Sequence, residues 1–143
     1  MRKSGHVICL LFSMILSVSA ADTKAVKNPE GNCSISVPTN WTAGTLGNAE
    51  SPDKKMSIIV SSPKRGLTSI TQVQQMAPGI YPDDKVTKNS SSEFEMEGKS
   101  TSGKPNVYRA IPAGARVCIA EITYENGNTA DARSTVETLK AEK

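Results

Sequence analysis

The alternation of apolar and polar residues is the feature that most constrains the fold of this 143-residue chain. Cys33, Ile35 and Val37 alternate with serines, and Phe94 and Met96 alternate with glutamates. A period of two places successive side chains on opposite faces of a β-strand, so one face of each strand is expected to be buried. On this pattern the glutamates at 93, 95 and 97 are expected to mark a solvated face.

The pattern along the chain predicts an order of strand, strand, helix, several antiparallel strands and helix. This order is typical of an α+β domain, in which helices pack on an antiparallel β-sheet. The expected elements are strands at 33–37 and 56–60, a helix that begins after Thr68 or Ser69 and ends at Pro78 and Gly79, weak strands at 85–90 and 92–97, a hairpin of 106–111 and 115–124, and a C-terminal helix that begins after Asn128 or Thr129 and has an apolar stripe of Ala132, Val136 and Leu139.

The N-terminal residues have the order of a secretory signal peptide. Arg2 and Lys3 precede an apolar run at 7–18, and Ser19, Ala20 and Ala21 follow it. We expect residues 1–21 to be removed by cleavage after Ala20 or Ala21. The alternative is an uncleaved membrane anchor, but the 15 residues from 7 to 21 are short of the roughly 20 that a spanning helix needs. The expected location is therefore periplasmic or secreted, with no membrane span after cleavage.

The rest of the chain is too short for two ordinary domains. Residues 22–32 are polar and contain Pro29 and Gly31, which predicts a flexible lead-in. Residues 33–143 are expected to form a single domain.

Composition excludes several classes of function for the chain after residue 21. Its 15 basic and 14 acidic side chains nearly balance, so the chain lacks the excess of basic residues that is typical of a nucleic-acid-binding protein. The one histidine, His6, lies in the predicted signal peptide. A Ser/His/Asp or Cys/His nucleophile is therefore excluded, and a zinc site would need thiols and carboxylates. We assign no catalytic, cofactor-binding or metal-binding residue.

Cys33 and Cys118 are the two thiols that remain once the signal peptide, with Cys9, is removed. An exported protein meets an oxidising compartment, so we predict a disulfide bond between them. Both residues also lie on the apolar side of strand-like runs, and two buried free thiols are the alternative. If the bond forms, the chain-entropy model gives about 4 to 5 kcal/mol as an upper figure for its contribution.

Two segments carry a resemblance to a known family. Residues 35–41 (ISVPTNW) resemble the opening strand, proline and tryptophan of the PsbP/DcrB-like superfamily, and residues 118–139 resemble its C-terminal strand and helix. The resemblance implies an α/β/α sandwich around an antiparallel sheet, found on small exported proteins and lipoproteins. The chain departs from the family pattern by having Cys33 where a large apolar residue often stands, and by lacking a lipidation cysteine. The functions of that family are diverse, so the fold alone does not name an activity.

Four acidic residues are a candidate cation site. Asp83 and Asp84 could join Glu93 or Glu95 to hold calcium, but the spacing of an EF-hand is missing and adjacent loop acids are commonly just solvated.

Several other residues allow both a functional and a structural reading. Glu121 lies within an apolar strand. Its functional interpretation is an acid/base group, and its structural interpretation is a paired or edge-facing carboxylate. Arg109 and Arg116 could pair with Glu121 or Glu93 across strands. Trp41 is expected in the core, with an exposed binding role as the alternative.

These observations favour a non-catalytic exported envelope protein that acts through contacts with an unknown protein partner. The alternative is a small-ligand or lipid carrier with a pocket between sheet and helix, and an enzyme ranks last. A filled core would favour protein contacts, whereas an enclosed apolar cavity of several hundred cubic ångström would favour a carrier.

Overall fold

The computed structural model describes residues 22–143, so the predicted signal peptide at 1–21 lies outside the described residues. In sequence order the strands are β1 (Thr23–Lys27), β2 (Cys33–Pro38), β3 (Thr42–Ala43), β4 (Asn48–Glu50), β5 (Met56–Ser61), β6 (Lys85–Asn89), β7 (Phe94–Lys99), β8 (Pro105–Ala113), β9 (Arg116–Tyr124) and β10 (Lys140–Ala141). The helices are α1 (Ile70–Ile80) and α2 (Thr129–Val136). Between 22 and 143, no helix is both long and apolar enough to cross a membrane.

The strands form two antiparallel sheets. The large sheet has the order β3-β4-β5-β9-β8-β7-β6, and the small sheet has the order β1-β2-β10. Every strand pair is antiparallel. The predicted α+β class with an antiparallel sheet is confirmed.

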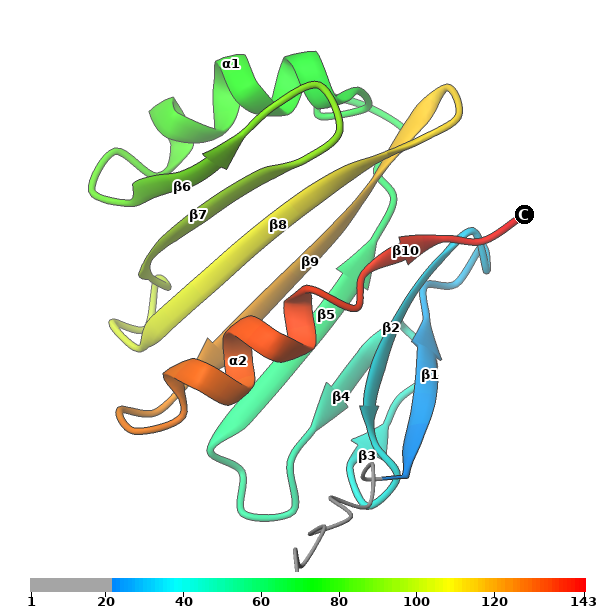
Figure 1. Cartoon of the computed structure of the whole chain (residues 1–143), viewed down its shortest axis with the longest axis vertical. Coiled ribbons are helices and arrows are strands. Elements are labelled where there is room, and N and C mark those ends of the chain that lie inside the picture. Colours follow the sequence, from blue (N-terminus) through cyan, green and yellow to red (C-terminus); the bar gives the residue numbers. More distant parts are fainter. Residues whose placement is uncertain (1–21) are drawn as a thin grey trace, which may run out of the picture.

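Each face of the large sheet has its own cover, as Figure 1 shows. On the first face, which we call the α2 face, α2 and the small sheet enclose the larger core, to which Ile35, Val37, Trp41, Ile58, Val60, Ile122, Ala132, Val136 and Leu139 belong. On the opposite α1 face, α1 encloses a smaller core of Val73, Ala77, Phe94, Met96, Tyr108, Ala110, Val117 and Ile119. Alternation along β8 and β9 therefore supplies side chains to two separate cores.

The cover of the α1 face is incomplete. α1 packs against β7 and β8, whereas β5 lies beyond it. Met56, Ile58 and Val60 of β5 are buried on the α2 face, but Ile59 points to the other side and is 48% exposed. The apolar run at 56–60 does form an inner strand, and one of its faces stays open to solvent.

The disulfide bond between Cys33 and Cys118 joins the two sheets. Cys33 begins β2, Cys118 lies in β9, and their Cα atoms are 5.5 Å apart. The two strands belong to different sheets, so the bond crosses between layers and holds the small sheet against the α2 face.

Residues 22–32 are not a flexible lead-in. Residues 23–27 form β1, which pairs with β2 from Thr23↔Pro38 to Lys27↔Ser34. Val26 is buried, and Asn28 closes the hairpin because its Oδ1 accepts from the Cys33 N–H at 3.0 Å. Burial of Val26 and the hydrogen bond of Asn28 therefore hold residues 22–32 in place, although the composition of this segment is that of a linker.

Both helices depart from their predicted ends. Ser69 caps α1 and forms a capping box with Gln72, as expected, but the helix continues through Pro78 to Ile80. A proline in the last turn removes only one helical hydrogen bond, and the Tyr81 N–H still donates to the Ala77 carbonyl at 2.9 Å. α2 ends at Val136, so Leu139 is buried after the helix rather than on it.

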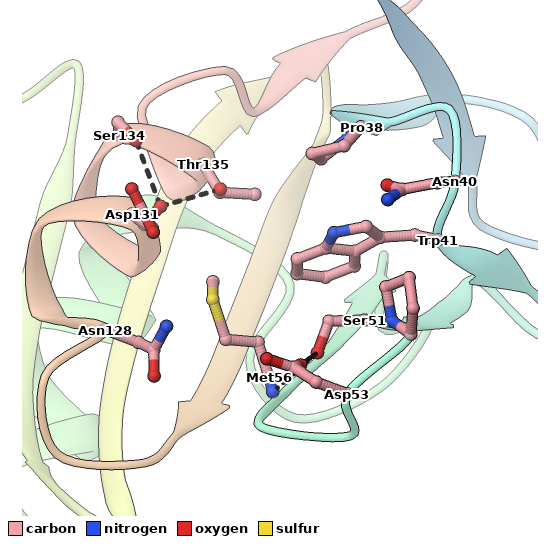
Figure 2. Close-up of a pocket in the computed structure, with 11 residues that line it drawn as sticks. Pro38, Asn40, Trp41, Ser51, Asp53, Met56, Asn128, Asp131, Ser134 and Thr135 are labelled. Atoms are coloured by element: carbon pink, nitrogen blue, oxygen red, sulfur yellow. Dashed lines mark hydrogen bonds between the residues drawn. The ribbon is translucent and has the colours of Figure 1, made fainter. Parts of the chain in front are cut away.

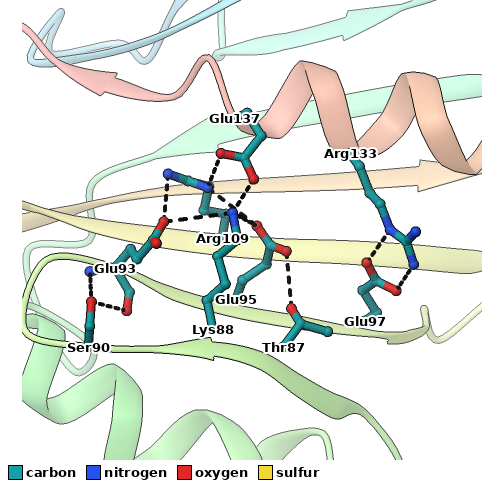
Figure 3. Close-up of polar contacts among 9 residues, drawn as sticks. All are labelled: Thr87, Lys88, Ser90, Glu93, Glu95, Glu97, Arg109, Arg133 and Glu137. Atoms are coloured by element: carbon teal, nitrogen blue, oxygen red, sulfur yellow. Dashed lines mark hydrogen bonds and ion pairs between the residues drawn. The ribbon is translucent and has the colours of Figure 1, made fainter.

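The glutamates of β7 do not form a solvated face. Figure 3 shows Glu93, Glu95 and Glu137 around the guanidinium of Arg109. Its nitrogens lie 2.8 Å from Glu93 Oε2, 3.4 Å from Glu95 Oε2 and 2.8 Å from Glu137 Oε2. Glu95 is only 4% exposed, because its register partner is Arg109 and α2 approaches the same face. Both sides of β7 are thus buried, one in an apolar core and one in an ion-pair cluster.

Reduction of the disulfide should lower the free energy of unfolding by several kcal/mol, with about 4 to 5 kcal/mol as the upper figure. Guanidinium chloride unfolding followed by fluorescence of Trp41, the single tryptophan, measures the change. The Cys33→Ala/Cys118→Ala variant is the control, because reductant should not move its midpoint. An oxidised protein whose midpoint is equally insensitive to reductant would contradict the prediction.

Arg109→Met should destabilise the protein by about 3 kcal/mol, because it removes one of the two cations near the buried Glu95 and leaves only Lys88, at 3.5 Å. The matched control is Arg133→Met, which removes an ion pair with Glu97 whose arginine side chain is 55% exposed. The control should have a much smaller effect. Urea unfolding of both variants tests this, and equal losses would show that burial does not set the strength of these pairs.

Candidate functional site

Carboxylates without an ion-pair partner identify two candidate sites on the described surface. Among residues 22–143, half of the fourteen acidic side chains form no ion pair with other described residues. One is Asp22, and the other six line two hollows, as Asp53 and Asp131 in one and Glu50, Asp83, Asp84 and Glu121 in the other. We call the first the Trp41 cleft and the second the Tyr81 groove.

The Trp41 cleft lies between α2 and the ends of β2 and β5, and has a volume of about 500 Å³. Figure 2 shows the indole of Trp41 on one side of the cleft and Asp131, Ser134 and Thr135 of α2 on the other, with the thioether of Met56 also in the lining. Trp41 is 6% exposed, so the predicted core position is correct, while one part of its ring also lines the cleft.

Hydrogen bonds hold the polar wall of the Trp41 cleft in place. Ser51 Oγ donates to Asp53 Oδ1 at 2.7 Å, and this hydrogen bond is the main cause of a lowered pKa at Asp53. Across the cleft, Ser134 and Thr135 donate to the backbone carbonyl of Asp131 at 3.0 and 2.7 Å. The lining contains two carboxylates and no lysine or arginine, which suits a polar or cationic group.

The Tyr81 groove crosses the uncovered part of the α1 face. It consists of two hollows of about 780 and 800 Å³ that share Tyr81, Ser100 and Thr101. The first hollow reaches Ile59 and Glu121 on the open face of the sheet, and the second reaches Ile80 and Asp84 at the end of α1. Two exposed isoleucines thus lie at either end of a groove with acidic walls.

A polar cluster lies under the Tyr81 groove. Asn106 Nδ2 donates to Glu121 Oε1 at 3.1 Å, and the rings of Tyr81 and Tyr108 are 6.0 Å apart between centroids. Burial raises the pKa of Glu121 above its usual range, and the nearby charge of Asp84 adds to this effect. Burial likewise raises the pKa of Tyr108.

Three buried atoms of this cluster have no hydrogen-bond partner within the described chain. They are Asp84 Oδ2, Asn106 Oδ1 and the hydroxyl of Tyr108. Asn106 and Tyr108 are 1% and 3% exposed. Buried polar groups in proteins are nearly always paired, so three unpaired atoms in one place make this cluster a candidate site.

Of the ion pairs that the sequence suggested for Arg109 and Arg116, the structure contains only one. Arg109 pairs with Glu93 as predicted, but Glu121 projects from the opposite face of the sheet and pairs with neither arginine. Arg116 donates to the backbone carbonyl of Ser62 instead.

The proposed calcium group of Asp83, Asp84, Glu93 and Glu95 is not assembled. Both glutamates contact Arg109 on the α2 face, whereas Asp84 lies on the α1 face over Gly98. Across residues 22–143, no three histidine, cysteine, aspartate or glutamate side chains are grouped in a way that could hold a metal ion. The geometry suits non-covalent binding of a group that carries hydrogen-bond donors.

Asn106 and Tyr108 were missed by sequence reasoning, and so was the exposure of Ile59. The alternating strand at 106–111 could have identified Asn106 and Tyr108 as facing the same side. Their placement beside Glu121 depends on the register of β8 with β9, which no short motif encodes.

Glu121→Gln should raise the melting temperature at pH 7. A carboxyl whose pKa is raised in the folded state favours folding below its usual value of 4.5, and this contribution is lost as the pH rises through the raised value. The gain from glutamine should therefore shrink when unfolding is measured at pH 4. Glu50→Gln, at an exposed position of the same groove, is the control and should leave the melting temperature unchanged at both pH 7 and pH 4. A loss of stability in Glu121→Gln at pH 7 would contradict the prediction.

No protein-family model matches the chain, and no curated protein does. Solved structures that match include the cyanobacterial PsbP (CyanoP) of Synechocystis sp. PCC 6803, with a TM-score of 0.49, 10% identity and coverage of 88% of this chain and 96% of that one. A protein of Bacteroides thetaiotaomicron matches with a TM-score of 0.47 and 14% identity, over 86% of this chain and 49% of that one. LpqN, involved in cell envelope biogenesis of Mycobacterium tuberculosis, matches with a TM-score of 0.45 and 12% identity, over 82% and 86%. All three TM-scores are below 0.5 and all three identities are below 25%, so these matches carry no conclusion about the function of this chain.

Proposed function

We propose that this chain is an exported, non-catalytic protein that acts by binding a protein partner through the Tyr81 groove. Export is supported by the signal-peptide pattern at 1–21 and by the Cys33–Cys118 disulfide, since such bonds persist in oxidising compartments. The expected location is the periplasm or the outside of the cell.

The uncovered part of the α1 face is the observation that carries this proposal. Ile59, on an inner strand of the large sheet, is 48% exposed, and Ile80 across the groove is 53% exposed. Large apolar side chains on the open face of an inner strand, next to buried polar atoms without partners, are typical of a surface that another molecule covers. Tyr81, half-buried between the two isoleucines, belongs to the residue types enriched in interfaces.

The Trp41 cleft supports a second candidate function, the binding of a small ligand. It lies between the sheet and α2, where a carrier pocket is expected, and its 500 Å³ falls in the range of small-molecule sites. The cleft is a surface hollow rather than an enclosed apolar cavity, and its carboxylates suit a polar ligand better than a lipid.

Capture experiments with matched surface variants test the first proposal. The wild-type protein, cross-linked in an extract of the cell envelope, should retain a partner that Ile59→Asp and Ile80→Asp lose. Met76→Asp is the control, because Met76 lies on α1 outside the groove and is 47% exposed, nearly the same as Ile59. All three variants are first checked by thermal unfolding, so that a loss of capture reports the surface and not the fold.

The outcome separates the two candidate functions. Retention of the same partner by both isoleucine variants would exclude the Tyr81 groove as the binding surface. If Asp131→Asn abolishes capture while Ile59→Asp does not, the Trp41 cleft is the functional site.

A further inference from the structure

We infer that the Tyr81 groove receives a basic side chain of the partner, an arginine or a lysine, between the carboxylates of Asp84 and Glu121. This inference rests on the proposed function and specifies the chemistry that the partner must present.

The fold places Asp84 and Glu121 on either side of Asn106. Gly98 of β7 is the register partner of Asn106 in β8, and the Asp84 carboxylate lies directly over Gly98. A Cβ at residue 98 would lie 1.7 Å from Asp84 Oδ1, so only glycine leaves room for this carboxylate. On the other side, Asn106 Nδ2 donates to Glu121. The two carboxylates therefore share one amide as their neighbour.

The cluster has more unpaired acceptors than donors, because the Tyr108 hydroxyl is the only one of its three unpaired atoms that carries a hydrogen. Asp84 Oδ1 accepts from the Lys99 N–H at 3.3 Å, but Asp84 Oδ2 accepts nothing from the described residues. Asn106 Oδ1 is also without a donor, although the residue is only 1% exposed and its amide nitrogen is used by Glu121. Buried acceptors without donors are costly, and the missing element is a group rich in N–H donors.

No basic side chain of the described chain neutralises the pair. Lys99 and Lys104 line the walls of the groove, but Lys99 contributes its backbone N–H, and the Lys104 ammonium lies 3.8 Å from Glu125. On the α2 face, in contrast, Arg109 forms an ion pair with the buried Glu95. The Tyr81 groove is therefore the place where partly buried carboxylates are left for an external cation.

Side-chain chemistry favours a guanidinium or an ammonium over a metal ion. Calcium takes six to eight oxygen ligands and usually several carboxylates, whereas the cluster offers two carboxylates and one amide oxygen. A guanidinium brings five N–H donors and an ammonium three, which matches the shortage of donors. Tyr81 and Tyr108 add ring faces with which a cation interacts favourably.

A pair of isosteric peptides tests this inference on the disulfide-bonded protein. The probes are acetyl-Ala-Arg-Ala-amide and acetyl-Ala-citrulline-Ala-amide, which differ in the charge of one side chain. Nuclear magnetic resonance titration should show saturable shifts of the amides of Asp84, Gly98, Lys99 and Glu121 with the arginine peptide. The citrulline peptide should bind at least about tenfold more weakly.

Matched variants locate the binding in the groove. Asp84→Asn/Glu121→Gln should abolish the shifts caused by the arginine peptide, whereas Asp53→Asn/Asp131→Asn, which alters the acids of the Trp41 cleft, should leave them unchanged. The amide spectrum of each variant shows whether it is folded, and the single variant Glu121→Gln replaces the pair if the double variant is not. Equal binding of the two peptides, or unchanged binding in the groove variant, would overturn the inference. Shifts of these amides with calcium chloride and none with the arginine peptide would also overturn it.

Failure of this inference and failure of the proposed function have different signatures. If partner capture requires Ile59 but survives Asp84→Asn/Glu121→Gln, the groove binds a partner without a basic anchor. If the arginine peptide binds as expected but capture is independent of Ile59, the basic site exists and the proposed protein interface does not.

Discussion

The need to cover both faces of one antiparallel sheet determines most of this structure. The large sheet presents apolar side chains on two sides, and the described chain supplies two short helices to cover them. The α2 face is closed because a second sheet joins α2 there and the Cys33–Cys118 bond holds that sheet in place. The α1 face has only α1, which packs on β7 and β8, so β5 remains open and exposes Ile59. The Tyr81 groove is a direct consequence of this unequal cover.

Charge follows the same division. Where α2 covers polar residues of the sheet, Arg109 and Lys88 pair with the glutamates of β7 and with Glu137, and the ion pairs lower the pKa of Glu137. A buried pair of this kind is costly to break, so it holds α2 to a fixed position. On the open face, in contrast, Glu121 keeps a raised pKa and has only Asn106 as a hydrogen-bond partner among the described residues. Asp84 and Glu121 on the α1 face thus form no ion pair with other described residues, which suits the proposed binding surface.

Strands β2 and β5 to β9 were predictable because alternation and turn residues are local signals, whereas the short strands β3, β4 and β10 were not predicted. β1 was not predictable either, since its sequence holds one apolar residue that becomes buried, Val26, and pairing with β2 supplies the rest of its stability. The burial of Glu95 was also missed, because alternation shows which residues share a face but not whether something covers it. For the same reason the candidate site could be predicted only in part. Glu121 stands out in an apolar strand, but its meeting with Asp84 depends on strand register and on a close approach over Gly98.

Hydroxyl-radical footprinting of the protein alone and bound to its captured partner tests the central claim, that the open α1 face is the binding surface. Ile59, Ile80 and Met76 have similar exposure in the free protein, and the labelling of each residue is compared with its own labelling in the complex. The account predicts that the partner protects Ile59 and Ile80 while labelling of Met76 is unchanged. Protection confined to Trp41 and Met56 in the Trp41 cleft, with Ile59 still labelled as in the free protein, would contradict it.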